Sequence, residues 1–112
     1  MSMKVREIVG ELEWKVLAGE GYLDKEVGGG YVADLLSCVM AGAEANDLWI
    51  TLQTHANIVA VASLLGIAAI VVAEGAQVPE ATLAKADEQE MAVLSSPEPV
   101  YETVSRLVAL GI

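Results

Sequence analysis

Three kinds of residue are scarce in this chain of 112 residues: cysteine, basic residues and aromatic residues. The one cysteine, Cys38, excludes an internal disulfide and a cysteine-based metal cluster, and its apolar neighbours at 35–40 predict a buried, inert thiol. Six basic residues stand against 16 acidic ones, which gives a formal net charge of −10. Nucleic acid and anionic membranes bind to a basic protein face, so neither is expected as a partner.

Aromatic residues make up only 4% of a chain that is 54% hydrophobic, so its core must consist of valine, leucine, isoleucine and alanine. The length fits one domain, which we expect to span residues 1–112. A domain of this size leaves a large share of its surface in water. So much apolar content therefore predicts a subunit interface. Two-fold assemblies are the commonest kind, which makes a homodimer the expectation.

The sequence also lacks the apolar core of a signal peptide near its start. Its longest apolar run, residues 58–73, is interrupted by Ser63 and Gly66 and falls short of the roughly 20 residues that a bilayer span needs. A helix followed by a strand explains this run better, and we expect a cytoplasmic protein.

Hydrophobic periodicity and turn residues predict an alternation of helices and strands. The expected elements are a helix at 3–12, a strand at 14–18, a loop-rich stretch at 19–30, a helix at 35–43 capped by Asp34, a strand at 48–52, a helix at 55–65 ended by Gly66, a strand at 67–73, a helix at 80–90 opened by Pro79, a strand at 91–94 and a final helix started by Ser96 and Pro97. The strand at 67–73 is apolar throughout, as strands covered on both faces are. The predicted fold class is α/β, a single domain with a mostly parallel sheet and helices on both faces.

A polar segment, residues 51–57, separates the apolar strand from the apolar helix that follows it, and it holds the only histidine, His55. An open α/β sheet usually binds its ligand where a parallel strand ends and a helix begins. With Thr54 as the helix N-cap, its hydroxyl would accept the backbone N–H of Asn57, and the first amides would face an anion. The helix dipole disfavours a charged His55, so we expect a neutral imidazole when no anion is bound.

The three later strands are expected to run parallel, so the loops after them should meet at one edge of the sheet. These loops carry polar residues at 53–57, 74–77 and 95–96. The residues predicted to bind a ligand are Thr51, Gln53, Thr54, His55, Asn57, Glu74, Gly75, Ser95 and Ser96. An alternative gives several of them structural roles alone: Thr54 and Asn57 cap one helix, the two serines cap the last, and Thr51 and Gln53 satisfy loop backbone groups.

The sequence shows no catalytic or metal-binding set. His55 has no evident carboxylate to orient it, and no His, Cys, Asp and Glu residues have the spacing of metal ligands. The glycines at 28–30 are not followed by the Lys-Ser/Thr of a P-loop, and the segment at 19–24 has Asp24 where a dinucleotide fingerprint has its third glycine. We therefore expect no catalytic residue, no metal and no cofactor.

Several segments of the chain resemble the DRTGG domain family. They are Met3–Val9, Trp49–His55, Asn57–Ala62, Gly66–Val72, Pro79–Glu80, Arg106–Leu107 and Leu110–Ile112. The resemblance implies a parallel α/β domain with an accessory or regulatory role, often self-associating and without established catalytic activity. Related domains occur in phosphotransacetylases, in CBS-containing pyrophosphatases and ahead of the kinase domain of HPr kinase/phosphorylase.

The chain departs from the motif that gives this family its name. The Asp-Arg pair falls at Thr54 and His55, and the Thr-Gly-Gly triplet falls at residues 73–75, where only Gly75 matches. The role of an Asp-Arg pair is therefore not transferred to this chain. Both positions nevertheless fall on loops that the sheet argument selects.

Together these observations predict a non-catalytic, dimeric module that senses a small anionic metabolite or nucleotide and acts through a partner protein. Two alternatives stay open. One is a purely structural dimerisation or docking domain, and the other is an enzyme that acts on a phosphorylated substrate.

Overall fold

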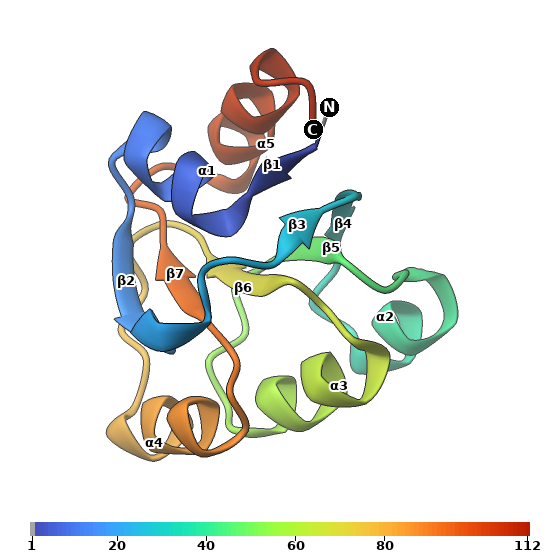
Figure 1. The fold of residues 1–112 in the computed structure, drawn as a ribbon. Helices are drawn as coiled ribbons and strands as arrows, with labels where there is room; N and C mark the ends of the chain where they lie inside the picture. Colours follow the sequence, from blue (N-terminus) through green and yellow to red (C-terminus); the bar gives the residue numbers. More distant parts are fainter. Residues whose placement is uncertain (1) are drawn as a thin grey trace.

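The computed structural model describes residues 2–112 and shows the predicted alternation of helices and strands (Figure 1). In chain order the elements are β1 (Met3–Lys4), α1 (Val5–Leu12), β2 (Lys15–Ala18), the 3₁₀ helix η1 (Glu20–Tyr22), β3 (Glu26–Val27), β4 (Gly29–Val32), α2 (Leu36–Gly42), β5 (Asp47–Thr51), α3 (Asn57–Leu65), β6 (Ala69–Val72), α4 (Glu80–Glu88), β7 (Val93–Ser95) and α5 (Val100–Ala109). The short strands β1 and β3 form a separate antiparallel pair.

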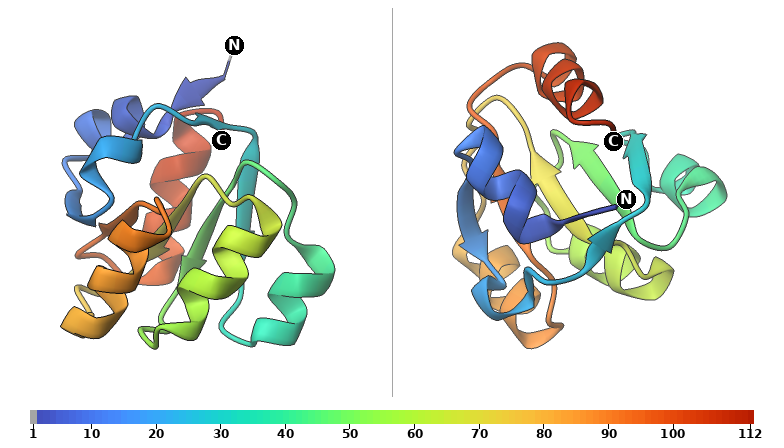
Figure 2. Two further views of the ribbon diagram at one scale, coloured as in Figure 1. Left: turned by 60° about the horizontal axis from the view of Figure 1, so that its bottom comes forward. Right: turned by 45° about the horizontal axis from the view of Figure 1, so that its top comes forward.

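The main sheet has five strands in the order β2-β7-β6-β5-β4. The strands β4 to β7 are parallel and follow one another both along the chain and across the sheet, whereas β2 is antiparallel to β7. An irregularity in register interrupts the pairing of β2 between Val16 and Ala18. Because every parallel crossover moves in the same direction, right-handed connections place α2, α3 and α4 side by side on one face (Figure 2).

The sheet is covered on both faces, which confirms the predicted α/β fold class. On one face, residues of α2, α3 and α4 pack with Trp49 and Ile70. On the other face, α1 and α5 pack with Leu48, Ile50 and Val71. Successive residues of β5 and β6 thus point into different cores, as strand geometry requires. All of β6 is fully buried, which explains the apolar run in the sequence.

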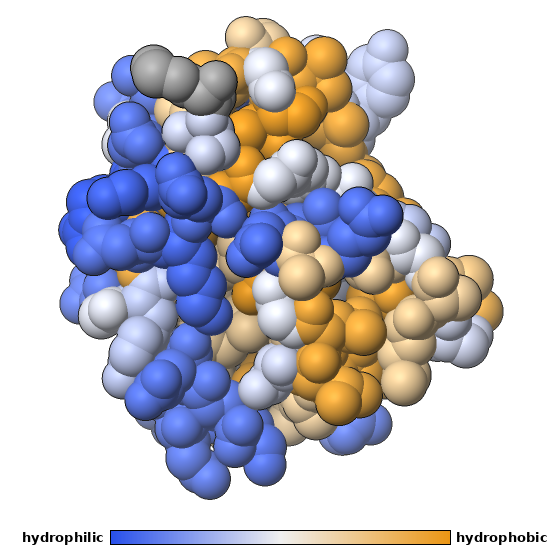
Figure 3. All heavy atoms as spheres, turned by 45° about the vertical axis from the view of Figure 1, so that its right-hand side comes forward, coloured by the Kyte–Doolittle hydropathy of each residue, from blue (hydrophilic) through white to orange (hydrophobic). Residues whose placement is uncertain are grey.

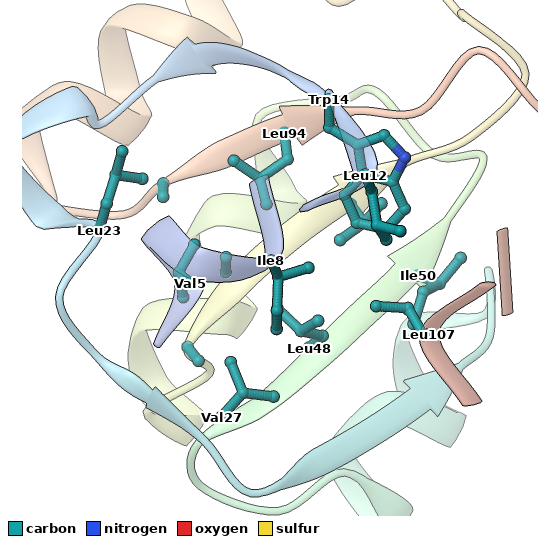
Figure 4. Close-up of a cluster of buried hydrophobic side chains, with 14 of the residues drawn as sticks. Val5, Ile8, Leu12, Trp14, Leu23, Val27, Leu48, Ile50, Leu94 and Leu107 are labelled. Carbon is teal, nitrogen blue, oxygen red and sulfur yellow. The ribbon is translucent and has the colours of Figure 1, made fainter. Parts of the chain in front are cut away.

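One apolar stripe holds α1 against the sheet. Its residues Val5, Ile8 and Leu12 lie in the same buried cluster as Leu48 of β5 and Leu94 of β7 (Figure 4). Their spacing of three and four residues places them on one side of a helix. The predicted amphipathic helix at the start of the chain is confirmed.

Several local expectations are wrong. The final helix α5 begins at Val100, after Pro99 and without a side-chain cap, so Ser96 and Pro97 do not start it. Gly29 and Gly30 belong to strand β4 and not to a loop, because pairing with β5 outweighs the poor strand propensity of glycine. Cys38 is exposed, because α2 contacts the core through its neighbour Val39. Asp34 does not cap α2, which begins after Leu35 without any side-chain cap. No helix within residues 2–112 has both the length and the apolar character needed to cross a membrane.

Gly19, just after β2, has a backbone φ of +74°, and a Cβ at this position would lie 2.5 Å from the carbonyl oxygen of Met91. We predict that Gly19→Ala lowers the free energy of unfolding by about 3 kcal/mol, because the left-handed backbone costs about 1–2 kcal/mol and the overpacking about 1–3 kcal/mol. Gly21→Ala is the control, because a Cβ there meets nothing within 4 Å. Urea unfolding should show a small change for this control, and equal losses in both variants would contradict the prediction.

Candidate functional site

The loops that follow β5, β6 and β7 meet at the carboxyl edge of the sheet, because these strands are parallel neighbours. They comprise residues 52–56, 73–79 and 96–99, so the structure brings together the polar segments that the sequence selected. β6 leads to α4 on one face, whereas β7 leads to α5 on the other. The connections after β6 and β7 therefore leave the sheet toward opposite faces, and open α/β sheets bind ligands at the carboxyl edge where neighbouring connections do so.

Thr51 fixes the loop after β5. Its buried hydroxyl donates to Oδ1 of Asp34 at 2.8 Å and accepts the backbone N–H of Gln53 at 3.0 Å. The N–H of Leu52 donates to the same Asp34 oxygen at 2.7 Å. Asp34 thus ties the end of β4 to the end of β5, which is the role it has in place of capping α2. The hydroxyl of Thr51 is engaged within the protein.

His55, and not Thr54, caps the first turn of α3. The N–H of Asn57 donates to Nδ1 of His55 at 3.0 Å, and Ala56, which directly precedes the helix, makes no side-chain bond. The carbonyl of Thr54 accepts the hydroxyl of Thr82 at 2.7 Å and so ties this loop to α4. The predicted cap by Thr54 is therefore wrong. Because Nδ1 accepts a hydrogen bond, a neutral His55 carries its proton on Nε2.

Glu74 and Gly75 form a turn with φ values of +62° and +60°. The N–H of Glu74 donates to the carbonyl of Glu98, and the N–H of Gly75 donates to the carbonyl of Ser96, each at 2.9 Å. Successive N–H groups in a turn are often an anion site, but both groups are already bonded here. Ser96 is also engaged, because it is buried with its hydroxyl 2.7 Å from that of Thr103 on α5.

A cavity of about 720 Å³ lies at this edge between β2, the loop after β6 and the start of α4. It is lined by residues 75–79 of the loop, by Glu80 and Leu83 of α4, by Lys15 and Leu17 of β2, and by Ser95. Lys15 and Ser95 are partners in the sheet, so their side chains come from neighbouring strands. Gly75 and Ser95 are the predicted residues that line the cavity, whereas the polar segment 51–57 lies outside its lining.

The lining combines an apolar wall, made by Leu17, Val78 and Leu83, with a few polar groups. Lys15 supplies a cation that the sequence did not single out. Its place at this edge depends on β2 being antiparallel, so that its first residue lies where the parallel strands end, and no local pattern reveals that direction. Within residues 2–112, no three His, Cys, Asp or Glu side chains gather in a way that would hold a metal ion.

The sequence profile of the DRTGG domain matches residues 7–110. This chain belongs to the DRTGG domain family. The match covers most of the chain and confirms the resemblance found in the sequence. No curated protein matches the chain.

A solved structure shares the fold of this DRTGG domain. It is the crystal structure of the CBS and DRTGG domains of the regulatory region of Clostridium perfringens pyrophosphatase, complexed with the activator diadenosine tetraphosphate. The two chains are 20% identical with a TM-score of 0.72, and the likeness covers 93% of this chain and 45% of that one. This chain therefore spans less than half the length of the chain in that structure.

We predict that His55→Ala lowers the free energy of unfolding by about 1 kcal/mol, because it removes the acceptor for the N–H of Asn57 at a helix start. Thr54→Ala should change it by less than about 0.5 kcal/mol, because only the backbone carbonyl of Thr54 is bonded across the loop. Chemical denaturation of both variants tests this ranking. If Thr54→Ala lowered the free energy of unfolding more than His55→Ala does, Thr54 would be the cap and the prediction would be contradicted.

Proposed function

We propose that this DRTGG domain is a non-catalytic regulatory module that binds a small anionic metabolite, such as a nucleotide, at the carboxyl edge of its sheet and acts through a partner protein. The cavity beside Lys15 is the observation that carries this proposal. Its volume of about 720 Å³ falls within the range of about 300–1,000 Å³ that is typical of small-molecule sites. It lies at the carboxyl edge of the parallel strands, which is where open α/β sheets bind ligands.

The chemistry of the lining favours a ligand with an anionic group at one end and an apolar or hydroxylated part at the other. Lys15 attracts the anion, and Leu17 and Leu83 offer apolar surface to a ring. Glu80, in the first turn of α4, accepts hydrogen bonds from hydroxyl or amino groups and repels a phosphate. A nucleotide is therefore expected to place its phosphate toward Lys15 and its sugar or base toward Glu80.

Some of the residues predicted from the sequence remain in this proposed site. Gly75 and Ser95 line the cavity. The exposed side chains of His55, on the neighbouring loop, and Asn57, at the start of α3, lie at the same edge, where Nε2–H of a neutral His55 is a donor for an anion. Ser96, like Thr51, is left out because its hydroxyl is bonded within the protein.

The regulatory part of the proposal is supported by the family and by the solved structure with the same fold. That structure is of a regulatory region and contains an activator, which is a property of that pyrophosphatase. For this chain we propose the same kind of task, a response to a small molecule that is passed to another protein. We further propose that the chain works as a homodimer.

A purely structural docking domain is the second candidate. Exposed apolar side chains favour it, notably Val32, Tyr101 and Val108, which are 48%, 82% and 62% exposed. Under this alternative, association depends on the apolar surface and no anion binds at the cavity.

Thermal unfolding with a panel of nucleotides and phosphorylated metabolites distinguishes the two candidates. We predict that at least one compound raises the midpoint and that Lys15→Gln weakens its binding about fivefold, which corresponds to about 1 kcal/mol. Binding weakens because the substitution removes the cation that attracts the anionic group of the compound.

Lys4→Gln is the matched control, because it makes the same change in charge on β1, outside the cavity. It should bind the compound as the unchanged protein does. A panel in which no compound raises the midpoint, or equal weakening by both substitutions, would contradict the proposal.

A further inference from the structure

The charged side chains in the lining of the cavity at the carboxyl edge are those of Lys15 and Glu80. Lys15 is the first residue of β2, and Glu80 is the first residue of α4. Within residues 2–112 the two ion pairs are formed by arginines elsewhere in the chain, so the ammonium group of Lys15 is available to a ligand. One cation and one carboxylate give the lining a formal charge of zero. The lining therefore offers a cation to one phosphate group and has no surplus of positive charge for others.

The first backbone N–H groups of the loop after β6 are bonded within the protein. Those of Glu74 and Gly75 donate to carbonyls of the loop after β7, and that of Ala76 donates to the carbonyl of Ala73 at 3.3 Å. Sites for several phosphates commonly use free N–H groups of a loop and of the helix start that follows it. Here the carboxylate of Glu80, in the first turn of α4, already complements the positive end of the helix. The backbone of this loop therefore adds little to the attraction of a second phosphate.

The charge of the whole chain acts in the same direction. Acidic residues outnumber basic ones by 16 to six, and Figure 3 shows hydrophilic side chains gathered on one side of the molecule with hydrophobic ones beside them. A protein with a formal net charge of −10 repels an anion more strongly as the charge of that anion grows. A ligand at the cavity thus gains from Lys15 once, and every further negative charge on it meets repulsion.

We propose that the cavity binds compounds with a single phosphate and discriminates against diphosphates and triphosphates. This inference rests on the proposed function and narrows its ligand class. Lys15 and the hydroxyl of Ser95, its partner in the sheet, hold the phosphate, because both line the same part of the cavity. Glu80 accepts hydrogen bonds from hydroxyl or amino groups at the other end of the ligand. A second or third phosphate would extend from Lys15 into the cavity and meet the carboxylate of Glu80.

Coulomb's law gives the size of the expected preference. A triphosphate carries about two more negative charges than a monophosphate, and each of them lowers the affinity about twofold when a like charge lies about 8 Å away in water. With the repulsion from the rest of the chain added, a nucleoside triphosphate should bind about fivefold more weakly than the monophosphate of the same nucleoside. A site built for polyphosphates would show the opposite order.

Isothermal titration of the full chain with two series of probes tests this inference. One series is adenosine mono-, di- and triphosphate, and the other is inorganic phosphate, pyrophosphate and tripolyphosphate. EDTA is present throughout, because divalent cations would neutralise the added charge. We expect the dissociation constant to rise along each series, by about fivefold from the first member to the third.

Three substitutions locate the origin of this preference. Glu80→Gln should bring the triphosphate to within about twofold of the monophosphate, because it removes the repelling carboxylate. Glu88→Gln is the matched control, since it makes the same change in charge on α4, outside the lining of the cavity, and it should leave the preference unchanged. Gln77→Lys places a second cation in the lining and should make the triphosphate the tighter ligand.

The outcomes separate this inference from the proposed function. If the triphosphate binds the unchanged chain at least as tightly as the monophosphate, and Lys15→Gln weakens both, the restriction to one phosphate is overturned while the anion site stands. Equal effects of Glu80→Gln and Glu88→Gln would assign the preference to the overall charge and overturn the role given to Glu80. If no member of either series binds, the proposed anion site is overturned, and the restriction to one phosphate with it.

Discussion

The burial of β6 on both of its faces is the constraint on which the rest of the molecule depends. A strand with no polar side has to be covered twice, so helices must leave the sheet in both directions. Both faces are covered because α4 and α5, which follow the adjacent strands β6 and β7, pack on opposite faces of the sheet. The cavity beside Lys15 lies on the α4 side of the carboxyl edge, between β2, the loop after β6 and the start of α4.

The rest of the carboxyl edge is held by its own polar groups. Asp34 and Thr51 join β4 to β5, Thr82 joins α4 to the loop before α3, and Ser96 joins β7 to α5. Polar residues at a strand end either bind a ligand or position a loop, and most of those found here position loops. A firmly held edge is what a binding site requires, because a ligand then meets groups that need no rearrangement.

The sequence was sufficient for features that local patterns determine, such as the apolar run of β6 and the end of α3 at Gly66, whose φ is +72°. It was insufficient for features that depend on pairing with segments distant in the sequence. The glycine-rich strand β4 exists because β5 pairs with it, and Lys15 reaches the edge because β2 runs antiparallel. Thr54 and His55 are adjacent, and each is able to cap a helix. The hydrogen bond from Thr82 to the carbonyl of Thr54 fixes this loop in the conformation in which His55 is the cap.

The two borders of the main sheet are unequal. At one border, β2 carries Lys15 and an irregular register, features that discourage the addition of another strand. At the other border, β4 is regular and uncharged. The irregular register and the charge of β2 therefore leave β4 as the border that more readily accepts another strand.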